Sequence, residues 1–162
     1  MVIRNIKEFL KLTFKKKLIC LDIGKKKTGI AISDQNQSMV MPHKVLQRDK
    51  EFLLKVMNIV TEFSIEGIVV GTPINSEKKI NRMSQAINDT TKNIDQFLFN
   101  NNIDLPIFFW DESYTSLEAE DLTKEFFKTS KHQKKHIDKF AAKIILDDFL
   151  KEYLNLNEKK NN

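Results

Sequence analysis

Residues 18–34 read LICLDIGKKKTGIAISD, and this stretch decides the fold that we expect for the chain. Two short runs rich in Ile, Leu and Ala, at 18–23 and 28–34, are separated by a turn that begins with Gly24 and continues with lysines. Short apolar runs on either side of a glycine turn are typical of a β-hairpin. Because Asp22 comes just before the turn, the stretch predicts a hairpin with a carboxylate at the end of its first strand.

The remaining sequence predicts alternating strands and helices. Apolar residues recur at three- and four-residue spacing from Asp49 to Phe63 and from Ile80 to about Asn100, which indicates two amphipathic helices. Further strands are predicted at 43–47, 66–71 and 106–112, and further helices from Thr115, from about Lys135 and within 1–17. This order predicts an α/β fold, a central mixed five-stranded sheet with an antiparallel hairpin edge and parallel strands, flanked by helices. We expect one domain at 18–154, a helical extension at 1–17 and a polar tail at 155–162.

The composition narrows the class of protein. The 162 residues include 27 Lys and Arg against 22 Asp and Glu, a net charge of +5, which favours an anionic partner only weakly. The single cysteine, Cys20, cannot form an internal disulfide or a thiolate metal cluster, and we expect it to be a small buried residue. No apolar run approaches the roughly 20 residues that span a bilayer, and no signal peptide is recognisable. We therefore expect a cytoplasmic protein without stable membrane association.

Three acidic residues fall at the ends of predicted elements. Asp22 and Glu112 end strands, and Asp138 lies in the first turn of the last helix, beside its apolar stripe. Each acid alone also fits a structural role, as a solvated strand end or as a residue favoured by the helix dipole. In an open α/β sheet, however, ligands bind at the carboxyl ends of strands. Three carboxylates on separate elements together predict a site for one or two hard divalent cations, Mg²⁺ or Mn²⁺.

Basic residues flank two of these acids. The run GKKK follows Asp22, and the run KHQKKH at 131–136 comes just before Asp138. Lysines beside a carboxylate cluster can hold a nucleic-acid backbone close to bound metal ions, although solvated loops often have the same composition. The predicted nucleic-acid contacts from these runs are Lys25, Lys26, Lys27, Lys131, Lys134 and Lys135.

Four stretches, in order along the chain, resemble the motifs of a known family. They read LDIGKKKTGIAISD (21–34), VVGTPIN (69–75), WDESYTS (110–116) and HIDKFAAKIILDDFL (136–150). The chain resembles the YqgF (RuvX) family of small proteins, which are named for nuclease activity on pre-16S rRNA and have an RNase H-like fold related to RuvC-type Holliday junction resolvases. The resemblance implies that Asp22, Glu112 and Asp138 form a catalytic and metal-binding triad. It also implies that Gly24 and Gly29 allow close backbone approach around that site.

Two positions depart from the family's usual pattern. Ser113 stands where the family usually has arginine, which removes a planar fork that could orient a phosphate, and Lys27 replaces another arginine by a point charge. Arg82, near the loop that follows Pro73, is a candidate to supply a guanidinium to the nucleic acid. These changes bear on rate and substrate choice more than on metal binding, because the three acids are present.

The leading hypothesis is a metal-dependent endonuclease that hydrolyses phosphodiester bonds in structured RNA. The resemblance implies the 5′ end of pre-16S rRNA, or a pre-ribosomal particle, as its partner in ribosome biogenesis. Asp22 and Asp138 would bind the metal directly, and Glu112 would complete the shell or position the attacking water.

Three alternatives stay open. A Holliday junction resolvase on branched DNA would need a homodimer with two matched sites, and the sequence is compatible with a monomer or a homodimer. A non-catalytic RNA-binding module of ribosome assembly stays open because Ser113 stands where the family usually has arginine. An actin- or sugar-kinase-like ATPase also opens with Asp-x-Gly, but such proteins generally need two lobes to enclose ATP.

Overall fold

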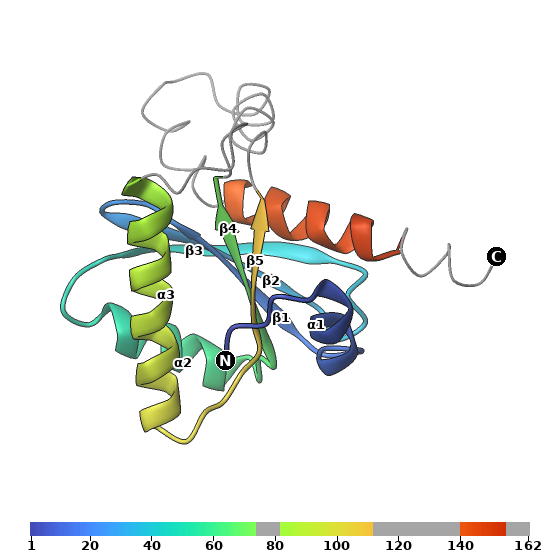
Figure 1. The fold of residues 1–162 in the computed structure, drawn as a ribbon, viewed down its shortest axis with the longest axis horizontal. Helices are drawn as coiled ribbons and strands as arrows, with labels where there is room; N and C mark the ends of the chain where they lie inside the picture. The colour runs from blue at the N-terminus through green and yellow to red at the C-terminus, as the bar shows by residue number, and fades with distance from the viewer. Residues whose placement is uncertain (74–81, 112–139, 155–162) are drawn as a thin grey trace.

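The computed structural model describes residues 1–73, 82–111 and 140–154 (Figure 1). The named elements, in chain order, are α1 (Ile6–Leu12), β1 (Leu18–Ile23), β2 (Lys27–Ser33), β3 (Val40–Gln47), α2 (Phe52–Glu62), β4 (Gly67–Thr72), α3 (Arg82–Asn100) and β5 (Ile107–Asp111). Residues 140–154 form a further helix, here called the C-terminal helix. The helix predicted from Thr115 lies outside the described residues. Among the residues that are described, no helix is long and apolar enough to cross a membrane.

The five strands form one mixed sheet in the order β3-β2-β1-β4-β5. β2 runs antiparallel to β1 and β3, whereas β1, β4 and β5 run parallel to one another. The predicted arrangement, an antiparallel hairpin joined to parallel strands, is therefore confirmed. Because parallel strands end at the same side of a sheet, Ile23, Thr72 and Asp111 mark one common edge, here called the carboxyl edge.

Helices cover both faces of this sheet (Figure 1). Alternate residues of β1 belong to different apolar clusters: Leu21 packs in the cluster that includes α2 and α3, and Cys20 packs in the cluster that includes α1 and the C-terminal helix. We call these the α2–α3 face and the C-terminal-helix face. Since β1 is buried on both faces, its residues read as a nearly continuous apolar run. Cys20 is fully buried, as its small apolar side chain predicted.

The opening residues differ from the helical extension expected at 1–17. The helix α1 covers only Ile6–Leu12, and the side chain of Asn5 caps it by accepting hydrogen bonds from two backbone N–H groups. Ile3, expected on the helical face, instead lies in an extended segment, and its N–H donates to the carbonyl oxygen of Ile107 in β5 at 2.8 Å. A sheet edge offers backbone partners that helical periodicity in the sequence does not encode, so the prediction of a helix before Asn5 was wrong.

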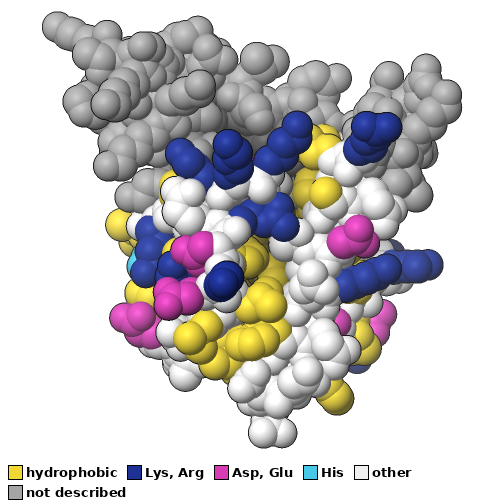
Figure 2. Space-filling model, turned by 90° about the vertical axis from the view of Figure 1, so that its left-hand side faces the viewer, with side chains coloured by type: hydrophobic (Ala, Val, Ile, Leu, Met, Phe, Trp, Pro, Cys, Tyr) yellow, Lys and Arg dark blue, Asp and Glu magenta, His cyan; other side chains and the backbone are white. Residues whose placement is uncertain are grey.

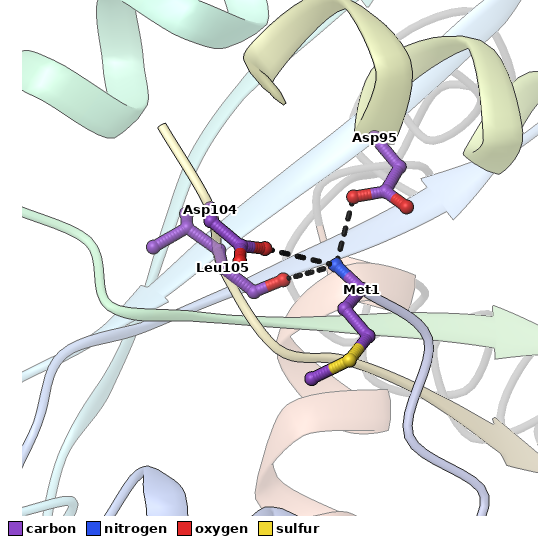
Figure 3. Close-up of polar contacts among 4 residues, drawn as sticks. All are labelled: Met1, Asp95, Asp104 and Leu105. Carbon is purple, nitrogen blue, oxygen red and sulfur yellow. Dashed lines mark hydrogen bonds and ion pairs between the residues drawn. The ribbon is translucent and has the colours of Figure 1, made fainter. Parts of the chain in front are cut away.

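The N-terminal ammonium group holds this extended segment against α3 and the loop before β5 (Figure 3). The nitrogen of Met1 lies 2.8 Å from Asp95 Oδ1 and 2.8 Å from the carbonyl oxygen of Leu105, and 3.5 Å from Asp104 Oδ1. All three charged groups remain partly or largely exposed. Exposed ion pairs stabilise only weakly, so the segment depends mainly on its backbone pairing and on the burial of Ile3.

The edge strand β3 begins at Val40, earlier than the predicted 43–47, and it includes Pro42. Its register against β2 shifts between Ile30 and Ala31, where a bulge lies. Proline lacks the N–H that a central strand needs, and it is tolerated at an edge or at a bulge. The proline that was expected to precede this strand therefore lies within it.

Candidate active site

Asp22 lies one residue before the end of β1, at the carboxyl edge of the sheet's central strand. Strand alternation turns its side chain to the C-terminal-helix face, the face of Cys20. Its partner across the antiparallel pair with β2 is Gly29. Since glycine has no side chain, no Cβ from β2 occupies the space beside the half-buried carboxylate. Asp22 thus stands at the strand end where the sequence predicted it, opposite a residue without a side chain.

Glu112 and Asp138, the other two predicted acids, lie outside the described residues. The elements next to them are packed together on the face of Asp22. Trp110, near the end of β5, donates from Nε1 to Asp148 Oδ2 of the C-terminal helix at 3.0 Å. Its ring also packs edge-on against Phe149, with a centroid distance of 5.4 Å. Within 1–73, 82–111 and 140–154, no three His, Cys, Asp or Glu side chains gather into a group that could hold a metal ion, so the triad stays a prediction.

The turn between β1 and β2 carries the lysine run. The N–H of Gly24 donates to the carbonyl oxygen of Lys27 at 2.8 Å. A Cβ at position 24 would lie 3.0 Å from that same oxygen, so a side chain would force this tight turn to shift. Lys25, Lys26 and Lys27 are all exposed. The turn therefore presents three ammonium groups to solvent, three to five residues after Asp22.

Arg48, which the sequence patterns did not single out, ties this turn to α3. Its Nη1 donates to the carbonyl oxygen of Gly24 at 2.8 Å, and its Nη2 donates to Thr90 Oγ1 at 2.6 Å. Its backbone N–H donates to the carbonyl oxygen of Lys26 at 2.9 Å. No sequence signal marks Arg48, because it follows a strand in an ordinary polar loop and its partners are distant in the chain.

Arg48 and Gly24 also line a cavity of about 360 Å³, here called the basic-rimmed cavity. The lining residues are Ile23, Gly24, Lys25, Arg48, Arg82, Met83, Ala86 and Ile87. Figure 2 shows Lys and Arg side chains gathered beside an apolar patch on the side of the molecule that carries α3. The structure thus brings together Lys25 and Arg82, two of the predicted nucleic-acid contacts. Lys26 and Lys27 extend from the same turn, whereas Lys131, Lys134 and Lys135 lie outside the described residues.

Asp34, the last residue of the first family-like motif, has a structural role at the opposite edge of the sheet. Its Oδ1 accepts hydrogen bonds from the N–H groups of Ser38 and Met39, both at 2.9 Å, and its Oδ2 accepts one from Ser38 Oγ. Partial burial raises the pKa of Asp34, but these hydrogen bonds outweigh it and leave the pKa below its usual value. Asp34 therefore stabilises the β2–β3 turn and does not belong to the candidate active site.

Comparison with known proteins identifies relatives along nearly the whole chain. The model of a family described as RuvX, Holliday junction resolvase, matches residues 16–152. A protein of Pelagibacter ubique named "Putative pre-16S rRNA nuclease" is 34% identical over 152 residues, which cover 90% of this chain and 97% of that protein. A protein of Rickettsia peacockii with the same name is 32% identical over 161 residues, covering 96% of this chain and all of its own length.

Two solved structures resemble the fold at low sequence identity. RuvC of Thermus thermophilus, in complex with a Holliday junction substrate, gives a TM-score of 0.52 at 10% identity, covering 85% of this chain and 96% of that one. The Fowlpox virus resolvase, solved with Holliday junction DNA, gives a TM-score of 0.53 at 15% identity, and the match covers 85% of this chain and 99% of that one. These likenesses concern the fold, and they confirm the expected RNase H-like architecture.

Proposed function

Because the chain belongs to the RuvX family, we propose that it is a nuclease that hydrolyses phosphodiester bonds, with pre-16S rRNA as its substrate. The relatives from Pelagibacter ubique and Rickettsia peacockii, which align with nearly the whole chain, carry that activity in their names. The observation that carries the proposal is the position of Asp22. This acid lies at the end of the central strand of the sheet, faces a glycine across the hairpin, and precedes a turn with three exposed lysines.

The proposed catalytic residues are Asp22, Glu112 and Asp138, and they would also hold the metal. A carboxylate set supplies only oxygen donors, which suit a hard cation such as Mg²⁺ or Mn²⁺. The position of Asp22 at the carboxyl edge, paired with Gly29, supports this assignment, because ligands of open α/β sheets bind at the carboxyl ends of strands. When bound, one or two such ions would stabilise charge on the attacking and leaving oxygens of the phosphodiester.

The chain's own residues would orient the substrate. Asp22 and Asp138 would bind the metal ion next to the phosphate that reacts. The Glu112 carboxylate would accept a hydrogen bond from the attacking water and so direct it toward the phosphorus. The three exposed lysines of the turn, Lys25, Lys26 and Lys27, would hold backbone phosphates next to the cut site. With serine at position 113, this substrate contact relies on lysines, which act as point charges, more than on an arginine fork.

The experiment that tests this function is cleavage of a 5′-extended pre-16S rRNA fragment at low salt with Mg²⁺, Mn²⁺ or EDTA. We expect metal-dependent cutting by the wild type. In Asp22→Asn the cleavage rate should fall about a hundredfold or more, because a neutral amide replaces one of the proposed metal-binding carboxylates. Asp138→Asn should behave in the same way. The matched control is Asp89→Asn, an exposed acid on α3 whose Oδ1 accepts a hydrogen bond from Gln85, and it should cut normally.

Two results would overturn the proposal. One is equal cleavage by wild type and Asp22→Asn. The other is measurable RNA binding by folded wild-type protein without turnover under any divalent metal. That second result would instead support a non-catalytic RNA-binding module, and Ser113→Arg would then test whether the missing guanidinium accounts for the lack of activity.

A second candidate function is Holliday junction resolution, which the description of the matching family model favours. Resolution needs two active sites with matched geometry and therefore a dimer on the junction. Paired symmetric cuts in a synthetic four-way junction, together with a dimer mass in light scattering, would support this function. A junction-bound monomer would contradict it.

A further inference from the structure

The basic-rimmed cavity combines an apolar floor with a charged rim. Ile23 and Ile87 are buried at 3% and 2% exposure, and Met83 and Ala86 contribute further apolar surface from α3. The rim carries the cations of Lys25, Arg48 and Arg82, and none of the described residues that line the cavity is acidic. A volume of about 360 Å³ suits a small organic ligand.

This lining narrows the chemistry of the ligand. Free phosphate would need the cations but gains nothing from an apolar floor, and a purely apolar ligand would leave three cations near it without use. A nucleotide meets both requirements, because a nucleobase is flat and largely apolar on its faces, and its phosphate is anionic. Arg48 is consistent with such a ligand, since its side chain donates hydrogen bonds to uncharged acceptors, the Gly24 and Lys25 carbonyls and the Thr90 hydroxyl.

The cavity also lies next to the candidate active site. Ile23 and Gly24 line it, and they follow Asp22 directly in the chain. Two residues of extended chain span about 7 Å, so Gly24 lies within about that distance of Asp22. Since Ile23 packs on the α2–α3 face and Asp22 turns to the opposite face, a strand that passes Asp22 would reach the cavity by crossing the carboxyl edge.

We propose that the basic-rimmed cavity receives one unpaired nucleotide of the substrate strand, close to the scissile phosphate. The base rests on Ile23, Met83 and Ile87, and Lys25 and Arg82 hold its phosphate at the rim. Arg48 positions the rim, because it fixes the Gly24 turn to α3. This inference rests on the proposed function, since it assumes that the substrate strand passes Asp22. It adds that the protein separates one nucleotide of that strand from its neighbours.

The test fills the cavity and removes the base in turn. Ala86→Phe places a ring in the cavity from an exposed position of α3, so the helix should fold normally. The matched control is Asn93→Phe, an exposed position of the same helix that is not among the residues lining the cavity. Both changes are made in the Asp22→Asn background so that RNA is bound without being cut. The probe is a fluorescent RNA that spans the cut site, with an abasic residue placed at each position in turn.

We expect one abasic position to weaken binding about tenfold in the Asp22→Asn protein, a typical contribution for one buried base. Ala86→Phe should weaken binding of intact RNA by a similar factor and remove the sensitivity to that abasic position. Asn93→Phe should change neither. Equal affinities for intact and abasic RNA at every position would overturn the inference, as would an unchanged abasic profile in Ala86→Phe.

Two further arms distinguish a cavity for the substrate strand from a cavity for a free nucleotide, and the cavity's role from that of the active site. If adenosine monophosphate alone binds at micromolar concentration and Ala86→Phe abolishes this without affecting RNA, the cavity serves a free nucleotide and the inference fails. If wild-type protein cleaves RNA in an Asp22-dependent manner but the abasic profile is flat, only the cavity inference fails. If the abasic position responds as expected but no metal supports cleavage, the cavity inference stands and the proposed nuclease function fails.

Discussion

Replacement of Arg48 separates two effects of its guanidinium, the positive charge and the planar fork. Arg48→Met removes both, and Arg48→Lys keeps the charge but cannot reach Gly24 and Thr90 at the same time in the same geometry. Each hydrogen bond from a charged donor contributes about 1.5–3 kcal/mol when buried. Because Arg48 and Gly24 are only half-buried, we expect Arg48→Met to lower the free energy of unfolding by about 2 kcal/mol in total.

The assay is thermal unfolding monitored by circular dichroism. For a domain of this size, about 2 kcal/mol corresponds to a fall in Tm of about 4–8 °C, and Arg48→Lys should lose about half as much. The matched control is Arg4→Met, an exposed arginine in the N-terminal segment, which should stay within about 0.5 kcal/mol of wild type. Hydrogen exchange supplies a local readout, because the Gly24 amide that bonds to Lys27 should lose protection in Arg48→Met.

A double-mutant cycle with Thr90→Val measures the coupling between the two side chains directly. Thr90 is 5% exposed and accepts from Arg48 Nη2, so the two substitutions should couple by about 1 kcal/mol. Additive effects, or a Tm of Arg48→Met equal to that of wild type, would refute the conclusion that Arg48 fixes the lysine turn to α3.

Three further predictions concern other parts of the molecule. Gly67→Ala should destabilise the fold by about 1–3 kcal/mol, because its Cβ would lie 2.6 Å from Thr13 Cγ2 and 2.7 Å from Leu18 Cδ2. Thr13→Ser in the same chain, measured by urea unfolding, should recover part of that loss. Because folding lowers the pKa of Asp34 from its ordinary value of 3.8, the ionised carboxylate stabilises the fold above about pH 4, and this stabilisation is lost as the pH falls through the lower folded value. Asp34→Asn should therefore show a flatter fall in Tm than wild type between pH 5 and about 3. Lys26→Gln should reduce the slope of log affinity against log salt for RNA by about 1, whatever the RNA sequence, and an unchanged slope would remove Lys26 from the interface.

Most of the fold could be predicted from local sequence patterns. Period-two and period-3.6 spacing reflects which side chains face the core, so the hairpin at 18–34 and the helix from Ile80 to about Asn100 were assigned nearly as the structure has them. The exceptions are segments that depend on distant partners. Ile3 pairs with Ile107 in β5, and Pro42 is accommodated by a bulge against β2, and neither fact is visible in local spacing.

The candidate site could be predicted only in part. Asp22 stood out because an acid ending an apolar run is conspicuous, and the lysine run after it marked the turn. Which neighbours these residues have was not predictable, since Lys25, Arg48 and Arg82 lie on different elements and meet only through packing.

The sequence by itself determined the order of strands and helices, the two faces of β1 and the place of Asp22 at its end, because these follow from local periodicity and turn chemistry. Only the tertiary structure decided that Arg48 joins the Gly24 turn to α3 and that an apolar cavity with a basic rim opens between this turn and α3. The physical reason is that such a cavity is the space left between non-local elements once their side chains have packed, and no stretch of the chain contains it.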